Sequence, residues 1–177
     1  TARMIRAAGI VFYNITFNNA SGGWSFGSTS AAVTNDFVIT NGTVTGSSGT
    51  ITINDDYSNS GTYTHNSGTV TFSQAAATST LSGTMTGSSA FYNLIFTYDN
   101  EIAAPDCERT GFTATHDFAA AATVSNLFTI NTTSAVEYET GATYTVNDMN
   151  WNGAGSFIYF RNSVTSGTWL LTVTAAG

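Results

Sequence analysis

The chain contains no lysine. Its four cations are arginines at positions 3, 6, 109 and 161, set against 11 acids for a formal net charge of -7. So few and scattered cations cannot neutralise a run of phosphates, which argues against a nucleic-acid partner. The same shortage argues against attraction to an anionic membrane surface. The lack of lysine also excludes Lys-Asn isopeptide cross-links, so the forces that stabilise the chain must be non-covalent.

Other residue types and motifs are scarce or absent, and these absences argue against further classes of protein. The single cysteine, Cys107, has no partner for an internal disulfide, and no run approaches the roughly 18 apolar residues of a membrane span. Neither a Gly-x-Ser-x-Gly elbow nor a glycine-rich phosphate loop is present, so we predict no enzyme activity and no cofactor. The chain begins at Thr1 without a recognisable signal peptide or end cap. This predicts either a piece of a longer precursor or ends that mate with copies of the chain.

Short alternating runs dominate what remains. Apolar residues occupy every second position between threonines, as in residues 50–53 and 69–72, and Asn-Gly or Ser-Gly pairs interrupt the runs. This pattern predicts short β-strands separated by turns. With 42% hydrophobic and only 8% charged residues, we expect one domain over residues 1–177, with a buried core and a surface of hydroxyls and amides. Such a surface suits an extracellular or cell-surface protein.

The sequence also repeats itself. Residues 12–17, Phe-Tyr-Asn-Ile-Thr-Phe, return 79 positions later as residues 91–96, Phe-Tyr-Asn-Leu-Ile-Phe. Residues 33–39 likewise resemble residues 124–130. We therefore predict a first repeat over about 10–90 and a second over about 91–177. The second gains an insertion loop at about 98–111, which holds the only proline and the only cysteine.

A repetitive all-β chain can form a sandwich, a barrel or a solenoid. The long, coarse repeat, the very short strands and the similar turns favour a parallel β-helix, with an antiparallel β-sandwich as the alternative. If one coil takes about 20 to 25 residues, the chain makes about seven or eight short coils stacked at about 4.8 Å. Inward Val, Ile, Leu and Phe would then form interior ladders, while Thr and Asn form exterior ones.

Two stretches carry a resemblance to a known class of protein. The first comprises residues 41–44, 48–53, 57–72 and 91–94, and the second residues 141–147, 151–153 and 159–163. They resemble the long repetitive β-helix surface proteins of environmental bacteria and archaea. The resemblance covers nearly all of the chain. It implies secreted, adhesin-like or fibre-like repeats, and it supplies no catalytic residues.

Carboxylates are the most suggestive candidates for a site. Asp55 and Asp56 form an acidic pair, although neighbours on a strand point to opposite faces and converge only in a turn. We expect a solvated turn there, with Ca²⁺ binding or acid-base catalysis as the alternative. In the insertion, four acids are weak metal-ligand candidates whose spacing matches no Ca²⁺ loop. These four are Asp99, Glu101, Asp106 and Glu108. We expect a hydrated loop in which Arg109 forms a local ion pair.

The histidines and aromatic residues give weaker evidence of a functional site. His65 and His116 have no acidic or serine companion at a useful spacing, and we expect both at the surface or in turns. The nine tyrosines and tryptophans considered can line a sugar-binding face, but we favour positions inside the coils or at their ends. These nine are Tyr13, Trp24, Tyr57, Tyr63, Tyr92, Tyr98, Trp151, Tyr159 and Trp169.

These observations predict an extracellular structural protein, a β-solenoid subunit that self-associates head to tail into a surface fibre. Strands near Ile10 to Phe17 and Leu170 to Thr174 would carry the junction by adding strand to strand. The predicted interface residues are Ile10, Val11, Phe12, Phe17, Leu170, Leu171 and Val173. An adhesin or carbohydrate-binding module that recognises glycans is the alternative. A polysaccharide lyase or hydrolase using Asp55 or Asp56 ranks last.

Overall fold

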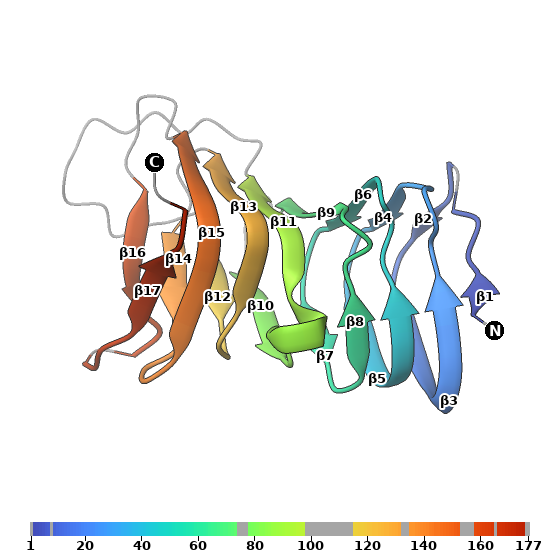
Figure 1. Ribbon diagram of the computed structural model, residues 1–177, viewed down its shortest axis with the longest axis horizontal. Helices are drawn as coiled ribbons and strands as arrows, with labels where there is room; N and C mark the ends of the chain where they lie inside the picture. Colours follow the sequence, from blue (N-terminus) through green and yellow to red (C-terminus); the bar gives the residue numbers. More distant parts are fainter. Residues whose placement is uncertain are drawn as a thin grey trace.

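A computed structural model describes residues 2–7, 9–73, 78–97, 115–131, 135–152, 158–164 and 166–175. The chain winds into a parallel β-solenoid that is longer along its axis than across it (Figure 1). Every strand pair between the described residues is parallel, so the predicted all-β parallel β-helix is confirmed and the antiparallel sandwich is wrong. The predicted insertion at 98–111 lies outside the described residues.

Two parallel sheets form the walls of the solenoid. The first contains β1 (Arg3–Met4), β3 (Ile15–Ser25), β5 (Phe37–Thr45), β7 (Tyr57–Asn59), β8 (Thr62–Thr64), β10 (Thr78–Gly83), β12 (Thr115–Phe118), β14 (Ala135–Tyr138) and β16 (Tyr159–Asn162). The second contains β2 (Val11–Phe12), β4 (Ala31–Val33), β6 (Thr50–Ile53), β9 (Thr69–Ser73), β11 (Phe91–Thr97), β13 (Thr123–Asn131), β15 (Thr143–Asn152) and β17 (Leu170–Val173). A short 3-10 helix, η1, covers Gly87–Ser89.

The chain makes about six turns, slightly fewer than the seven or eight predicted. Terminal windings flank them, β1 with β2 at one end and β16 with β17 at the other. Many hydrogen bonds between successive windings join residues 20 to 25 positions apart, for example Thr50 to Ser30 and Ser82 to Tyr57. The separation is larger across residues 98–114, where Asn126 donates to Asn93, 33 positions earlier. Most windings therefore have about the length that the strand spacing predicted, and the windings that include residues 98–114 are longer. The long axis of the molecule is the direction in which parallel strands stack (Figure 1).

Columns of side chains fill the interior because every second residue of a strand points inward. In the first sheet, Phe37 stacks on Tyr57 with ring centres 5.8 Å apart, and Phe118 stacks on Tyr138 at 5.7 Å. All four rings are buried. In-register stacking of this kind contributes about 0.5 to 1.5 kcal/mol per ring pair beyond the burial of apolar area. Aromatic columns thus fix the register between windings as well as stabilise the core.

A third line of short strands runs along the solenoid, and its N-terminal part is separate from the second sheet. That part consists of β1, the ends of β3 and β5, and β8, with Thr43–Thr45 lying against Thr62–Thr64. Beyond β8, the amide of Tyr63 donates to the hydroxyl of Ser89 in η1 at 3.1 Å instead of to another strand. A single bridge between Met85 and Ala122 continues the line. Beyond η1 the first segments of β13 and β15, residues 123–124 and 143–146, continue the line to β17, and in β13 a register shift separates this segment from the rest of the strand. The third line is therefore interrupted at η1 and joins the strands of the second sheet beyond it.

The repeated hexapeptide occupies two different places in the structure. Residues 12–17 run from β2 around a corner into β3, whereas residues 91–96 lie within the single strand β11. The residues that stack are instead one winding apart, as Phe37 and Tyr57 are.

Helical structure in the described ranges is limited, and no helix there is long and apolar enough to cross a membrane.

Candidate functional site

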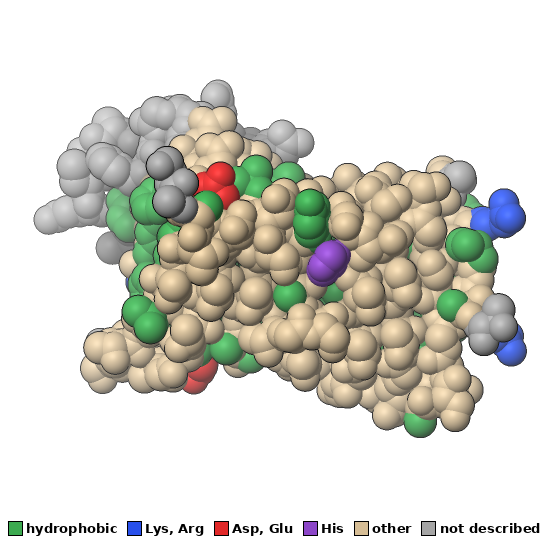
Figure 2. Space-filling view, viewed as in Figure 1, with side chains coloured by type: hydrophobic (Ala, Val, Ile, Leu, Met, Phe, Trp, Pro, Cys, Tyr) green, Lys and Arg blue, Asp and Glu red, His purple; other side chains and the backbone are tan. Residues whose placement is uncertain are grey.

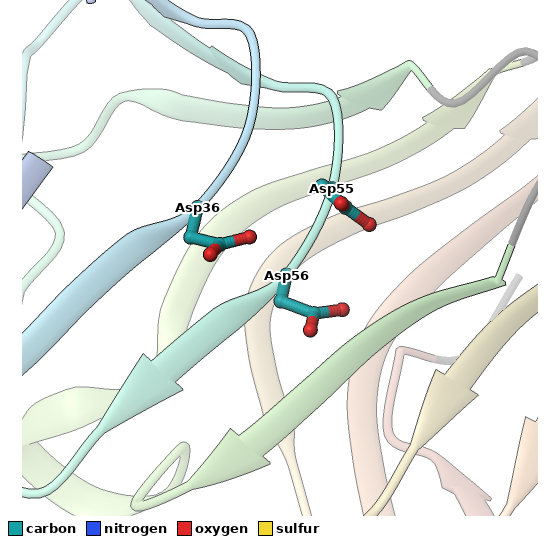
Figure 3. Close-up of side chains that lie close together, drawn as sticks. All are labelled: Asp36, Asp55 and Asp56. Carbon is teal, nitrogen blue, oxygen red and sulfur yellow. The ribbon is translucent and has the colours of Figure 1, made fainter. Parts of the chain in front are cut away.

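Three aspartates meet at one corner of the solenoid. Asp36 immediately precedes β5, and Asp55 and Asp56 immediately precede β7 in the next winding (Figure 3). One carboxylate oxygen of each lies within 4.8 Å of the others. Because Phe37 and Tyr57 are Cα partners, the residues just before them, Asp36 and Asp56, are also stacked. Asp55 lies beside them in the bend.

Backbone and amide groups hold this corner in place. The amide of Asp36 donates to Asn14 Oδ1 at 3.0 Å, and the amide of Thr80 donates to Asp56 Oδ1 at 2.8 Å. Each aspartate of the stacked pair is thus tied to the neighbouring winding. Clustered carboxylate oxygens are the ligands that Ca²⁺ prefers, but that ion takes six to eight oxygens, and three partly exposed carboxylates supply only part of such a set.

The turn expected at Asp55 and Asp56 is present, and Asp36 is the member that the sequence analysis missed. A signal for it exists in the chain. Residues 35–37, Asn-Asp-Phe, and residues 55–57, Asp-Asp-Tyr, lie 20 positions apart, which is one winding. Alignment at the period of one coil, rather than at the longer repeat, brings the two acidic corners together.

The acidic corner belongs to a longer feature that we call the polar column. It is the line of outward positions that precede the inward aromatic column of the first sheet. Its members, in order along the axis, are Asn14, Asp36, Asp56, Thr80, Asp117, Glu137 and Arg161. Four of the seven are acids, and the one cation occupies the last position.

Charge repulsion shapes the C-terminal half of the polar column. Burial raises the pKa of Asp117, and the nearby carboxylates of Glu137 and Glu139 raise it further. Arg161 reduces the repulsion among these carboxylates. Its guanidinium forms an ion pair with Glu137, in which Nε donates to Oε1 at 2.7 Å. Glu139 accepts a hydrogen bond from the Ser163 hydroxyl at 3.3 Å. Arg161 in the last winding therefore neutralises part of the negative charge that Glu137 and Glu139 bring to the winding before it.

The N-terminal end of the solenoid has open strand edges. In the described part of the chain, β2 pairs only with β4, and the first segment of β3, residues 15–18, pairs only with β5. Apolar side chains are exposed beside these edges: Met4 is 59% exposed, Val11 61% and Tyr13 71%. The predicted interface residues Ile10 and Val11 lie here and are exposed, and Phe12 is partly buried against the core.

The C-terminal end is open in the same way. Among the described strands, β16 pairs only with β14, and β17 pairs only with β15. Of the predicted interface residues, Leu170 and Val173 are exposed and Leu171 is partly buried. Figure 2 shows hydrophobic side chains at both ends of a surface that is otherwise largely uncharged.

Phe17 differs from the other predicted interface residues. Its side chain is buried in the core, with ring contacts to Trp24 at 5.1 Å and to Phe37 at 5.6 Å. Alternation along β3 explains this, because Ile15 and Phe17 both point toward the interior. At the N-terminal edge Phe17 therefore offers its backbone but not its side chain.

The two histidines have different environments. His65 is at the surface, where its Nδ1 accepts a hydrogen bond from the Ser67 amide at 2.9 Å and its ring lies 5.2 Å from that of Tyr92. His116 is completely buried, so the expectation of a surface position was wrong for it. It lies two residues before the inward Phe118 and so points inward too. Its ring stacks on Phe96 at 4.2 Å.

No described residue hydrogen-bonds to either ring nitrogen of His116, and the hydroxyl of its Cα partner Ser79 is likewise buried without a partner. Burial lowers the pKa of His116 from 6.5 to about 3. The imidazole is therefore neutral at physiological pH. A buried polar ring without a hydrogen-bond partner destabilises the core. The ring does not reach the surface, so we assign it no role as a general acid or base.

The aromatic residues fall into two groups. Tyr57 and Tyr63 are buried, and Trp24 and Trp169 pack against the core, in agreement with the favoured placement inside the coils. The most exposed are Tyr13 and Trp151, the latter 57% exposed. The remaining three are Tyr92 and Tyr159, which are partly exposed, and Tyr98, which lies outside the described residues.

Other predicted residues also fall outside the described ranges. They are Cys107, Arg109 and the four weak metal-ligand candidates Asp99, Glu101, Asp106 and Glu108.

Comparison of the chain with protein-family models, with curated proteins and with solved structures gives no match. The function must therefore be argued from the geometry of the column and the ends.

Proposed function

We propose that this chain is an extracellular structural protein that stacks head to tail on copies of itself to form a fibre. The observation that carries the proposal is the distribution of exposed apolar side chains. Among the described residues, the large exposed hydrophobic side chains are Met4, Ile10, Val11, Tyr13, Trp151, Val164, Leu170 and Val173. All but Trp151 belong to the two terminal windings, and Trp151 is the penultimate residue of β15, which pairs with β17.

Parallel stacking makes the two ends complementary. The strands β16 and β17 offer free backbone groups on the side away from β14 and β15, and residues 15–18 and β2 offer theirs on the opposite side. A second copy placed on the end of the first can add its β1 to β17, which continues the third line of strands in the same direction. Unpaired strand edges of this kind favour strand addition, and a head-to-tail contact between copies generates an open filament.

Composition supports an extracellular setting. A surface built from threonine, serine and asparagine, with 8% charged residues, stays hydrated without lysine. Among the described residues, the middle of the solenoid exposes few large apolar side chains, which favours association at the ends over association at the sides.

The test is the concentration dependence of assembly of the 177-residue chain, measured by sedimentation velocity and negative-stain electron microscopy. We expect rods whose length grows with concentration. Val11→Glu and Leu170→Glu each place a charge on an exposed end position and should leave folded monomers. Thr71→Glu adds the same charge at an outward position in the middle of the second sheet and should assemble as the unaltered chain does.

Circular dichroism checks that each variant keeps its β structure. An unaltered chain that sediments as a monomer over the whole concentration range would overturn the proposal. Filaments that persist in both end variants would also contradict it, because the junction would then lie elsewhere.

A carbohydrate-binding module is the second candidate. The pairing of the Tyr92 ring with His65 on the surface favours it, because partly exposed rings can stack on sugar faces. A glycan array probed with the chain and with Tyr92→Ala separates the two functions. Binding that the substitution removes would support the module, and no binding to any glycan would leave the structural function as the better explanation.

A further inference from the structure

A bulge in β11 brings an aromatic side chain and an amide to the same outward face. The pairing of β11 with β13 shifts register between Phe91 and Asn93. Phe91 and Leu94 are both buried. The two residues between them, Tyr92 and Asn93, are both partly exposed, whereas strict alternation would send one of them inward. Bulges of this kind re-aim side chains and are common beside functional sites.

The loop between β8 and β9, residues 65–68, places a second ring beside Tyr92. The ring of His65 lies 5.2 Å from that of Tyr92, at an interplanar angle of 35°. Its Nδ1 accepts a hydrogen bond from the Ser67 amide at 2.9 Å, so the neutral ring carries its proton on Nε2. Both rings are partly exposed, and we call the pair the aromatic platform.

Hydrogen bonds fix this loop in a strained backbone conformation. Asn66 and Ser67 have φ angles of 48° and 56°, in the left-handed region that residues with a side chain seldom occupy. The Asn66 side-chain amide donates to the carbonyl oxygens of Gly27 and Gly46 at 3.1 and 3.3 Å, in the two preceding windings. The backbone amide of Asn93 donates to the end of the loop at 3.2 Å. Strained residues held in this way cluster at ligand-binding sites, because the fixed loop needs no ordering when a ligand binds.

A line of polar side chains runs beside the aromatic platform through three windings. Asn126 Nδ2 donates to Asn93 Oδ1 at 2.7 Å, and Asn93 Nδ2 donates to Thr69 Oγ1 at 3.3 Å. All three side chains are uncharged and partly exposed, and we call them the amide ladder. Rings next to amides and hydroxyls match the two kinds of surface on a pyranose sugar, which are a face of C–H groups and a rim of hydroxyls.

The charges of the described residues narrow the class of sugar polymer. The described arginines, Arg3, Arg6 and Arg161, belong to the terminal windings, whereas β8, β9 and β11 lie in the middle of the solenoid (Figure 1). The winding after the amide ladder adds an exposed acid, Asp148, which is the Cα partner of Leu127. An acidic polysaccharide would be repelled by this carboxylate, and no described arginine lies in these middle strands to attract it.

We infer that the aromatic platform and the amide ladder bind a neutral polysaccharide, with a pyranose ring stacked on the two aromatic rings and its hydroxyls hydrogen-bonded to Asn93 and Asn126. This inference rests on carbohydrate binding, the second candidate function, and names the site and the class of ligand. It does not depend on assembly, because the site lies in the middle of the solenoid. A fibre of this chain would carry one such site per subunit along its side.

Affinity electrophoresis tests the inference. The gels contain β-glucan, xylan or mannan, which are neutral, or polygalacturonate, which is acidic, and the dependence of migration on polymer concentration gives a dissociation constant. We expect at least one neutral polymer to bind, and polygalacturonate to bind at least about tenfold more weakly. Tyr92→Ala removes the larger ring and should weaken neutral binding about tenfold. Tyr92→Phe keeps that ring and should stay within about threefold of the unaltered chain.

Two further variants complete the set. Tyr13→Ala is the matched control, because Tyr13 is 71% exposed but lies in the N-terminal winding, and it should bind within about twofold of the unaltered chain. His65→Ala removes the other ring of the platform and should also weaken binding. Circular dichroism checks the β structure of each variant. If Tyr92→Ala does not fold, His65→Ala carries the same comparison.

Failure of the site and failure of the function give different results. No binding to any of the four polymers would overturn carbohydrate binding and this inference with it. Neutral binding that survives both Tyr92→Ala and His65→Ala, or binding that favours polygalacturonate, would keep the function and overturn the inference alone. Sedimentation of Tyr92→Ala should match that of the unaltered chain, since the substitution leaves both ends unchanged.

Discussion

The buried imidazole of His116 predicts a loss of stability in acid. The side chain stacks on Phe96 at 4.2 Å, and the Phe72 ring lies 6.4 Å away. Its neighbours in the interior column are Ser79 and Val136, and neither carries a charge. The titratable neighbours on its own and adjacent strands, Asp117 and Glu137, occupy the outward polar column, so no described acid faces the ring. We propose His116→Phe as the perturbation.

The direction follows from the two protonation states. The pKa of His116 is about 3 in the folded chain, against 6.5 as the ordinary value. Between these values the unfolded chain binds a proton that the folded chain does not, so protonation favours unfolding. The destabilising effect of His116 is absent above about pH 7.5. It grows as the pH drops below 6.5 and reaches its full size near pH 3.

The magnitude follows from 1.36 kcal/mol per pKa unit. At about pH 4.5, two units below the unfolded value, His116 lowers the free energy of unfolding by about 3 kcal/mol relative to about pH 8. His116→Phe removes this part of the pH dependence. Asp117 acts in the opposite direction, because its raised pKa makes protonation in acid favour the folded state, but it is present in both chains and cancels from the comparison.

Urea unfolding followed by far-ultraviolet circular dichroism at about pH 8 and about pH 4.5 measures the effect. The fall in unfolding free energy between the two conditions should be smaller in His116→Phe by about 3 kcal/mol. His65→Asn is the matched control, since it alters the surface histidine and keeps an acceptor for the Ser67 amide. Equal falls in the unaltered chain and in His116→Phe would refute the reasoning. His116→Leu provides the same comparison if phenylalanine is too large for the site.

Two further predictions concern the backbone between windings. A methyl group added at Gly68 would overlap carbonyl oxygens of the preceding winding, so Gly68→Ala should lower the unfolding free energy by about 3 kcal/mol or more. Gly87 has open space around it but a positive φ of 58°, so the control Gly87→Ala should lower it by about 1 kcal/mol. Ser89→Ala removes the acceptor for the buried amide of Tyr63 and should cost about 1 to 3 kcal/mol in the same urea assay, with exposed Ser48→Ala as a control within about 0.5 kcal/mol. Equal values for the members of either pair would contradict the packing described.

Local pattern was sufficient to predict the fold class. Alternation in residues 50–53 and 69–72 identified strands β6 and β9, and their in-register pairing, Ile51 with Val70 and Ile53 with Phe72, gives the interior ladder that was expected. The physical reason is that a parallel coil demands only short apolar alternation and permissive turns, both of which are local. The number of windings was less accurate, because corners and strand ends have weaker patterns than strand centres.

Properties that depend on register were harder to predict. The resemblance between residues 12–17 and 91–96 does not reveal that one copy turns a corner while the other remains a strand. His116 appeared to be a surface residue because a single polar side chain does not disclose which face of its strand is buried. Asp36 joins the other two aspartates only through stacking of windings, and the polar column was not anticipated at all.

The interruption of the third line of strands at η1 gives any fibre of this chain a direction and a repeat. In each copy separate short strands form this line before η1, and segments of β13 and β15 form it beyond η1. A filament built by end-to-end addition would carry one such interruption per subunit, always in the same orientation. Image averaging along the filament should therefore show an axial periodicity of one subunit length and distinguish its two tips.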